Sequence, residues 1–176
     1  MINIQTYNLL VSCPRYRERD ASAELIYIFA EIGDDNIKVR PSGVPSLLFV
    51  KTKFEPIEAI HKLKEYFKEN LQFIKFTLRY LPIEIMVRSE IDNIIEAINK
   101  LKNKIKSDES YKILIEKRHT YLERNDIINK IASILNNKVD LKNPNKIILI
   151  EILGERTGIS IIEPDDIISV PKLKQV

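Results

Sequence analysis

The chain has 176 residues, enough for one full hydrophobic core or two small ones. Hydrophobic residues make up 44% of the sequence and charged residues 30%, which excludes a disordered or fibrous protein. One cysteine excludes an internal disulfide and a cysteine-based zinc site. The net charge of +3 divides into +2 before Leu81 (12 Lys and Arg minus 10 Asp and Glu) and +1 after it (16 minus 15), so neither half is a strongly basic domain. No apolar stretch approaches the roughly 18 residues of a membrane-spanning helix, so we expect a soluble, cytoplasmic protein without a membrane partner.

The first eighty residues alternate between strand and helix patterns. A two-residue apolar period is typical of a strand, and apolar stripes at three- and four-residue spacing are typical of helices. The order β-α-β-β-α-β predicts a ferredoxin-like domain over residues 1–81. The expected elements are a strand at 7–13, a helix at 25–32, strands at 37–40 and 47–50, a helix at 57–67 and a strand at 74–80.

Leu81-Pro82 interrupts this pattern, because proline cannot donate a hydrogen bond within a sheet. We therefore place a domain boundary there and assign residues 82–176 to a second domain, which makes the fold class α/β (α+β). Residues 147–152 are apolar on both faces, as in a central strand with a parallel neighbour. The other expected elements are a helix at 91–105, a strand at 111–116, a helix at 125–135, a turn at 154–158, a strand at 159–162 and a frayed tail at 171–174.

The sequence contains little that suggests catalysis. Four glycines in the whole chain cannot form a dinucleotide-binding or Walker phosphate loop. The expected strands carry almost no carboxylates, which a two-metal nuclease would need at strand ends. Cys13 is expected to be a small core residue, and His119 an RNA or packing contact. We therefore expect no catalytic residue, no metal, no cofactor and no small-molecule substrate.

Positively charged side chains, by contrast, gather at expected strand ends and in loops. Open α/β sheets place ligands at the carboxyl ends of their strands. The planar fork of arginine suits phosphate oxygens, and asparagine can hydrogen-bond a sugar or a base edge. Tyr16, between two of these arginines, either stacks on a base or fills the turn. We expect a single RNA-binding surface formed by Arg15, Arg17, Lys117, Arg118, Arg124, Lys142 and Asn143.

Several segments resemble a known family. Val139–Pro144, after Glu116–Thr120, resembles the hallmark of the THUMP domain, an RNA-binding module of tRNA thiolation, methylation and acetylation systems. Cys13–Glu18, Arg79–Glu84 and Leu153–Ile161 fit the same family. Taken together, the chain resembles the free-standing archaeal THUMP-domain proteins related to the eukaryotic adaptor for tRNA cytidine acetylation, with the THUMP domain over residues 82–176. Asn145 replaces an aspartate of many relatives, and Tyr16 a glycine.

This resemblance implies a non-catalytic adaptor. In the family, the ferredoxin-like and THUMP domains together bind the acceptor stem and 3′ end of tRNA. The resemblance therefore implies two partners, tRNA and an RNA cytidine acetyltransferase that forms 4-acetylcytidine in the D arm. Three alternatives stay open: an RNA-binding subunit of a split tRNA thiolation or methylation enzyme, a small metal-dependent hydrolase using His119, Asp165 and Asp166, and a scaffold that binds only proteins.

Overall fold

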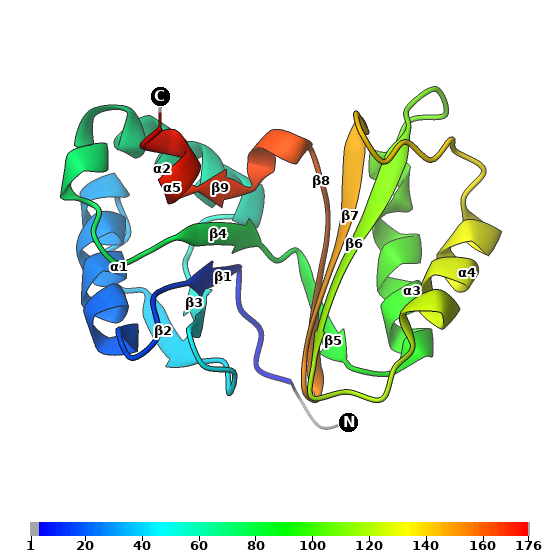
Figure 1. Cartoon of the computed structure of the whole chain (residues 1–176), viewed down its shortest axis with the longest axis horizontal. Coiled ribbons are helices and arrows are strands. Elements are labelled where there is room, and N and C mark those ends of the chain that lie inside the picture. Colours follow the sequence, from blue (N-terminus) through cyan, green and yellow to red (C-terminus); the bar gives the residue numbers. More distant parts are fainter. Residues whose placement is uncertain (1–3, 176) are drawn as a thin grey trace. The chain divides into compact units, whose positions relative to one another are not determined.

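The computed structural model describes residues 4–175, which divide into two compact units (Figure 1). The first unit comprises residues 7–83 and 165–175, and the second comprises residues 4–6 and 84–164. Within the described residues, no helix is both long and apolar enough to cross a membrane.

The first unit is an antiparallel sheet with two long helices packed against one face. Leu9 and Val11 of β1 share a core with Leu25 of α1 and Ile60 of α2, which explains the helical stripes in the sequence. The strand order β2-β3-β1-β4 is that of a ferredoxin-like domain and confirms this prediction. Its elements are β1 (Leu9–Ser12), α1 (Glu18–Ile32), β2 (Lys38–Pro41), β3 (Leu47–Lys51), α2 (Pro56–Asn70), the 3-10 turn η1 (Leu71–Phe73) and β4 (Arg79–Pro82).

The strand expected over residues 74–80 begins only at Arg79, the first residue of β4. Glu24 of α1 explains the difference, because its carboxylate accepts hydrogen bonds from the backbone N–H groups of Lys75, Phe76 and Thr77 at 2.8–3.2 Å. These backbone donors therefore bond to a side chain rather than to a neighbouring strand. Ile74 is nevertheless buried in the first core, which accounts for the apolar alternation.

Pro82 is the last residue of β4. The N–H of Ile83 donates to the Asn8 carbonyl at 2.7 Å, so in the alternating antiparallel pattern the nitrogen of Pro82 faces away from β1. On that other side only Arg79 and Tyr80 of β4 are paired. A proline at this position therefore removes no hydrogen bond from the sheet.

The C-terminal segment returns to the first sheet. β9 (Ile168–Ser169) pairs with β4 as a fifth strand, and α5 (Val170–Leu173) follows it directly. Ile168 and Val170 are buried in the first core. The tail is therefore ordered rather than frayed, and residues 165–175 belong to the first unit, whereas the sequence placed the whole of 82–176 in the second domain.

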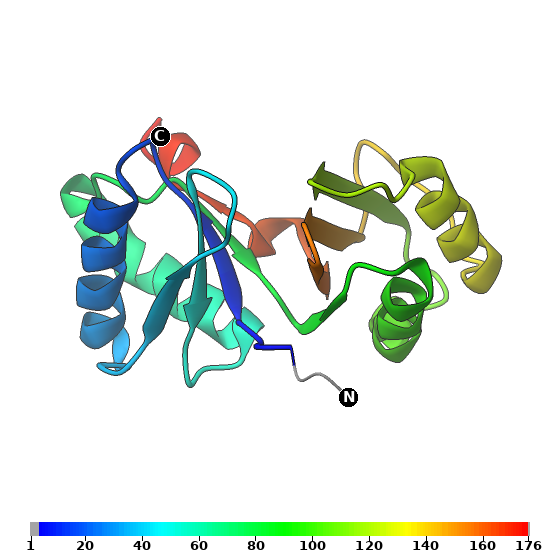
Figure 2. The same cartoon turned by 90° about the horizontal axis from the view of Figure 1, so that it is seen from below.

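The second unit is a four-stranded mixed sheet in the order β5-β8-β7-β6. β7 is buried along almost its whole length and pairs in parallel with β6, which confirms the predicted central strand. Two helices cover one face of this sheet (Figures 1 and 2). The elements are β5 (Ile85–Arg88), α3 (Ile91–Leu101), the 3-10 turn η2 (Lys102–Lys104), β6 (Tyr111–Arg118), α4 (Arg124–Ile134), β7 (Lys146–Leu153) and β8 (Arg156–Ile162), followed by the 3-10 turn η3 (Pro164–Asp166).

Candidate nucleic-acid interface

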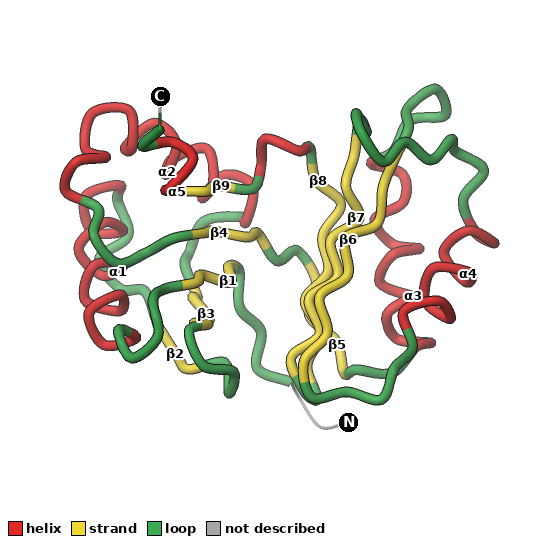
Figure 3. The backbone as a smooth tube through the Cα atoms, in the orientation of Figure 1, coloured by secondary structure: helices red, strands yellow, loops and turns green. Residues whose placement is uncertain are grey.

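The longest irregular segment of the second unit is the α4–β7 loop, residues 135–145 (Figure 3). Asp140 organises its centre: the Oδ1 atom accepts hydrogen bonds from the backbone N–H groups of Asn143 and Lys142, each at 3.0 Å. These two bonds hold the pKa of Asp140 below its usual value, because they favour the charged carboxylate. The side chains of Lys142 and Asn143 are thereby left exposed on a loop whose backbone is fixed.

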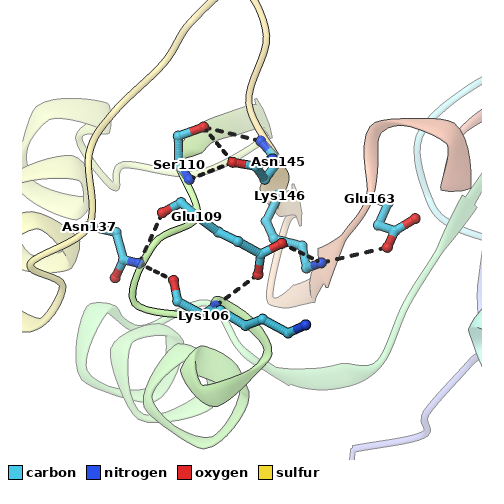
Figure 4. A network of polar contacts seen from close by, with 7 residues as sticks. All are labelled: Lys106, Glu109, Ser110, Asn137, Asn145, Lys146 and Glu163. Atoms are coloured by element: carbon cyan, nitrogen blue, oxygen red, sulfur yellow. Dashed lines mark hydrogen bonds and ion pairs between the residues drawn. The ribbon is translucent and has the colours of Figure 1, made fainter.

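Backbone bonds to the start of β6 hold the same loop in place. The Tyr111 N–H donates to the Lys138 carbonyl, and the Asp140 N–H donates to the Tyr111 carbonyl, both at 3.0 Å. Farther along, Oδ1 of Asn145 accepts from the backbone N–H of Ser110 at 2.8 Å and from its hydroxyl at 3.1 Å (Figure 4). An aspartate oxygen could accept the same bonds, so the asparagine at this position preserves the contact.

Lys146, the first residue of β7, lies beneath this loop and is not available to a ligand. Its ammonium is 3.2 Å from Oε2 of Glu109 and 3.6 Å from Oε1 of Glu163, and its side chain is 14% exposed (Figure 4). The backbone N–H of Lys106, together with Lys146, lowers the pKa of Glu109. Asn137 closes the network by donating to the carbonyls of Lys106 and Glu109 at 2.7 and 3.0 Å. This network therefore holds the loop rather than binding a partner.

A groove of about 310 Å³ lies beside the network, between η2 and the end of α4. Amide and lysine side chains line it, among them Lys102, Asn103 and Asn136. Asp108 adds a negative charge at the neighbouring turn, and Lys104 is paired with Glu84 at 2.7 Å.

We call the remaining polar side chains at this end of the unit the loop-end surface: Lys102, Asn103, Lys106, Asn136, Lys138, Lys142 and Asn143. Sequence reasoning identified Lys142 and Asn143 but missed the groove, whose walls come from segments about thirty residues apart.

The other three predicted cations of this unit lie near the end of β6. Arg118 donates from Nη1 to Oε2 of Glu151 at 2.6 Å. Lys117 donates to the Leu122 carbonyl at 2.8 Å, and Arg124 donates to the Ile115 carbonyl at 2.9 Å. Because side chains alternate along a strand, Lys117 and Arg118 also point to opposite faces of the sheet. All three side chains therefore make contacts within the protein.

The prediction that the cations of this unit form a single surface is wrong, because they lie at opposite ends of the strands. Lys142 and Asn143 precede β7 and lie beside the start of β6, whereas Lys117 and Arg118 are the last residues of β6. The eight residues of β6 separate the two groups by about 23 Å, at about 3.3 Å per residue. The error arises because β6 and β7 run in the same direction. Residues that precede β7 therefore lie at the opposite end of the strands from residues at the end of β6.

Arg15 and Arg17 lie in the first unit, in the β1–α1 loop of residues 13–17. The guanidinium of Arg15 lies over the Tyr16 ring, 5.4 Å from its centroid, and Arg17 forms an exposed ion pair with Asp20 at 3.2 Å. Cys13 is buried, as predicted, and burial raises the pKa of its thiol to about 11. The thiol therefore stays protonated near neutral pH and fills core space.

The residues of the alternative hydrolase site are distributed over both units. His119 is exposed directly after β6 in the second unit. Asp166 is buried in the first unit, with its Oδ1 atom 3.3 Å from Nε2 of His61. Among residues 4–175, no three histidine, cysteine, aspartate or glutamate side chains form a group that could hold a metal ion.

Comparison with known proteins finds a family match within the second unit. Residues 88–162 match the family model of the THUMP domain. A Drosophila melanogaster protein named THUMP domain-containing protein 1 homolog is 31% identical over 132 residues, which make up 69% of this chain and 41% of that protein. The protein MJ0421 of Methanocaldococcus jannaschii is 28% identical over 137 residues, or 74% of this chain and 35% of that protein. The chain thus spans well under half of either relative.

Two solved structures share the fold of most of the chain. PH1313 from Pyrococcus horikoshii matches 90% of this chain and 55% of its own, with a TM-score of 0.58 and 16% identity. TrmN from Thermus thermophilus matches 89% of this chain and 45% of its own, with a TM-score of 0.59 and 11% identity. The matched segment 88–162 runs from the last residue of β5 to the last residue of β8. It includes the α4–β7 loop, and it is similar to the THUMP domain.

Proposed function

We propose that the chain is a non-catalytic tRNA-binding adaptor that presents tRNA, through its acceptor stem and 3′ end, to a separate RNA cytidine acetyltransferase. The reaction served is formation of 4-acetylcytidine in the D arm. The observation that carries the proposal is the THUMP-like segment over residues 88–162, whose longest loop displays the exposed side chains of Lys142 and Asn143. The similarity to the relative named THUMP domain-containing protein 1 homolog supports the RNA-binding part of this proposal.

The loop-end surface has the chemistry that tRNA binding needs. Lysine ammonium groups neutralise phosphates and release condensed counterions, which gives affinity that is independent of sequence. Asparagine amides can hydrogen-bond base edges and 2′-hydroxyls, and the 2′-hydroxyls allow a protein to distinguish RNA from DNA. Because Asp140 holds the backbone around Lys142, binding should cost little conformational entropy in this loop.

The remaining predicted contacts have different roles in this proposal. Arg15 and Arg17 supply a second cationic site, on the first unit. Lys117, Arg118 and Arg124 already donate hydrogen bonds within the protein, so an RNA contact at that end of β6 must use their other N–H donors. Lys142 is therefore the residue on which to test the proposal first.

The binding test compares Lys142→Ala with Lys130→Ala, an exposed lysine of α4 in the same unit. Fluorescence anisotropy with labelled tRNA is measured over a series of salt concentrations. Lys142→Ala is expected to weaken binding about three- to tenfold and to reduce the slope of log K against log salt by about 0.9, the value of one duplex phosphate contact. Lys130→Ala should leave both quantities unchanged. Equal effects of the two variants would contradict the loop-end surface as the tRNA site.

The partner is tested by nucleoside mass spectrometry of tRNA from cells that lack the gene. Loss of 4-acetylcytidine, restored by the wild-type gene, is the expected result. Loss of a thiolated or methylated nucleoside instead would assign the chain to a different modification system. Addition of the purified chain should also raise acetylation by the RNA cytidine acetyltransferase in vitro. Failure to stimulate acetylation of any tRNA would reject the adaptor role.

A further inference from the structure

Tyr16 has an unusual backbone conformation for a residue with a side chain. It is the third residue of the turn Pro14–Arg17, which the Arg17 N–H closes by donating to the Pro14 carbonyl at 3.1 Å. Its φ of 67° is positive, as at the third position of a type II turn, where glycine is preferred because a Cβ atom strains this region. A tyrosine at this position therefore stores strain that glycine would not.

Packing does not compensate for this strain. The Tyr16 residue is 83% exposed, so its ring gains little from burial. Strained residues persist where the surrounding structure holds them, and they cluster at binding sites. An exposed ring on a strained backbone therefore indicates a role in binding rather than in stabilising the fold.

The turn that carries the ring is held before and after Tyr16 by hydrogen bonds to Ser46, in the loop between β2 and β3. The Cys13 N–H donates to the Ser46 carbonyl at 3.0 Å, and the Ser46 N–H donates to Oε1 of Glu18 at 3.0 Å. The Arg15 guanidinium lies over the ring at 5.4 Å from its centroid. The ring is therefore presented on a rigid turn, with a cation over one of its faces.

We propose that Tyr16 is a stacking platform for an unpaired nucleobase, and that Arg15 and Arg17 contact the phosphates on either side of that nucleotide. This inference rests on the proposed RNA binding and names the class of nucleotide bound at the first unit. Aromatic side chains stack on bases of any sequence, but only where those bases are not already stacked in a duplex. The ligand is therefore a single-stranded segment of RNA rather than a helical stem.

Arg79 lies at the end of the sheet from which this turn leaves β1. It is exposed in β4, directly opposite Ser12, the last residue of β1 before the turn. A backbone that leaves the Tyr16 platform along the end of this sheet would meet a third guanidinium. The site thus fits a short run of nucleotides rather than an isolated base.

The test uses two RNA hairpins of identical stem, one with a short unpaired 3′ overhang and one blunt. Tyr16→Gly should weaken binding of the overhang hairpin about tenfold, the usual size of one lost stacking contact, and should change binding of the blunt hairpin less than twofold. Tyr16→Phe, which keeps the ring, should bind both hairpins within twofold of the wild type. A 2-aminopurine in the overhang should lose fluorescence on binding the wild type and Tyr16→Phe, but not Tyr16→Gly.

A stability measurement separates stacking from a structural role. Because glycine relieves the positive φ, the melting temperature of Tyr16→Gly should be no lower than that of the wild type. A clear fall in melting temperature together with unchanged overhang binding would show that Tyr16 only fills the turn. An equal loss on both hairpins would also overturn the stacking proposal. If the wild type binds neither hairpin nor tRNA, the proposed function itself fails, whereas binding that is insensitive to Tyr16→Gly rejects only this inference.

Discussion

The Nη1 atom of Arg118 lies 2.6 Å from Oε2 of Glu151, whose side chain is only 3% exposed. Arg118 ends β6 and Glu151 lies within the neighbouring β7, on the sheet face opposite the helices. A carboxylate at this depth requires a partner, because burial of an uncompensated charge is costly. Arg118, which the sequence marks only as an RNA contact, therefore has a structural role as well.

Replacing Arg118 with alanine should destabilise the fold. The change leaves the Glu151 carboxylate without this partner and should lower the free energy of unfolding by about 2–3 kcal/mol, less than for a fully buried pair because the Arg118 side chain is 26% exposed. Urea denaturation measures the loss. The double variant Arg118→Met with Glu151→Met should recover much of it, since neither charge then remains. An unchanged unfolding midpoint for Arg118→Ala would show that the pair does not stabilise the sheet.

The α4–β7 loop should loosen at acidic pH. Hydrogen bonds from the Asn143 and Lys142 backbone N–H groups lower the pKa of Asp140 from its ordinary 3.8, so the carboxylate stabilises the loop above that value. This stabilisation should be lost as the pH falls through the lowered pKa, that is, below 3.8. The amide chemical shifts of residues 142 and 143 report the change. Asp140→Asn should abolish this titration, and a midpoint above 3.8 would contradict the bonding pattern.

Asn145 should tolerate aspartate but not alanine. Its Oδ1 atom accepts two hydrogen bonds from Ser110, and an aspartate oxygen can accept both. Asn145→Asp should therefore change the free energy of unfolding by less than about 0.5 kcal/mol, whereas Asn145→Ala should cost about 1 kcal/mol. Denaturant titration of the two variants side by side provides the comparison. Equal stability of the two would mean that the contact with Ser110 contributes nothing.

Ile148→Asp should prevent folding of the second unit. Ile148 is fully buried in β7, between two paired strands, and a charge there costs about 5 kcal/mol or more, which is comparable with the stability of a whole domain. Leu141→Asp, at a loop position that is 72% exposed, is the matched control and should fold normally. Circular dichroism and thermal melting distinguish the two. Normal melting of Ile148→Asp would refute the central position of this strand.

Local patterns in the sequence predict much of the fold. The apolar run 147–152 indicates a central strand, and the stripes on α1 and α2 indicate helices on one face, because burial imposes these periods directly. By contrast, β5 (Ile85–Arg88) was missed, since four residues after a proline show no clear alternation. The return of Ile168 and Val170 to the first core also could not be predicted, because no local feature specifies which sheet edge a two-residue strand joins.

The candidate site was predicted less completely. Lys142 and Asn143 are exposed loop residues, as predicted, because polar side chains in a loop need no partner from the fold. The internal bonds of Arg118 to Glu151 and of Lys146 to Glu109 depend on strand register, which joins residues more than thirty positions apart. The sequence shows which cations are present, but the strand register determines which of them form ion pairs within the protein.

Because β9 lies after the segment that matches the THUMP family, the outer edge of β4 depends on residues that follow residue 162. Unpaired strand edges readily recruit strands from other molecules. A truncation after Pro164 would uncover Tyr80 and the backbone groups of Arg79, and aggregation should start at that edge even though the RNA-binding loops are intact. Residues 165–175 thus protect this edge of the sheet against self-association.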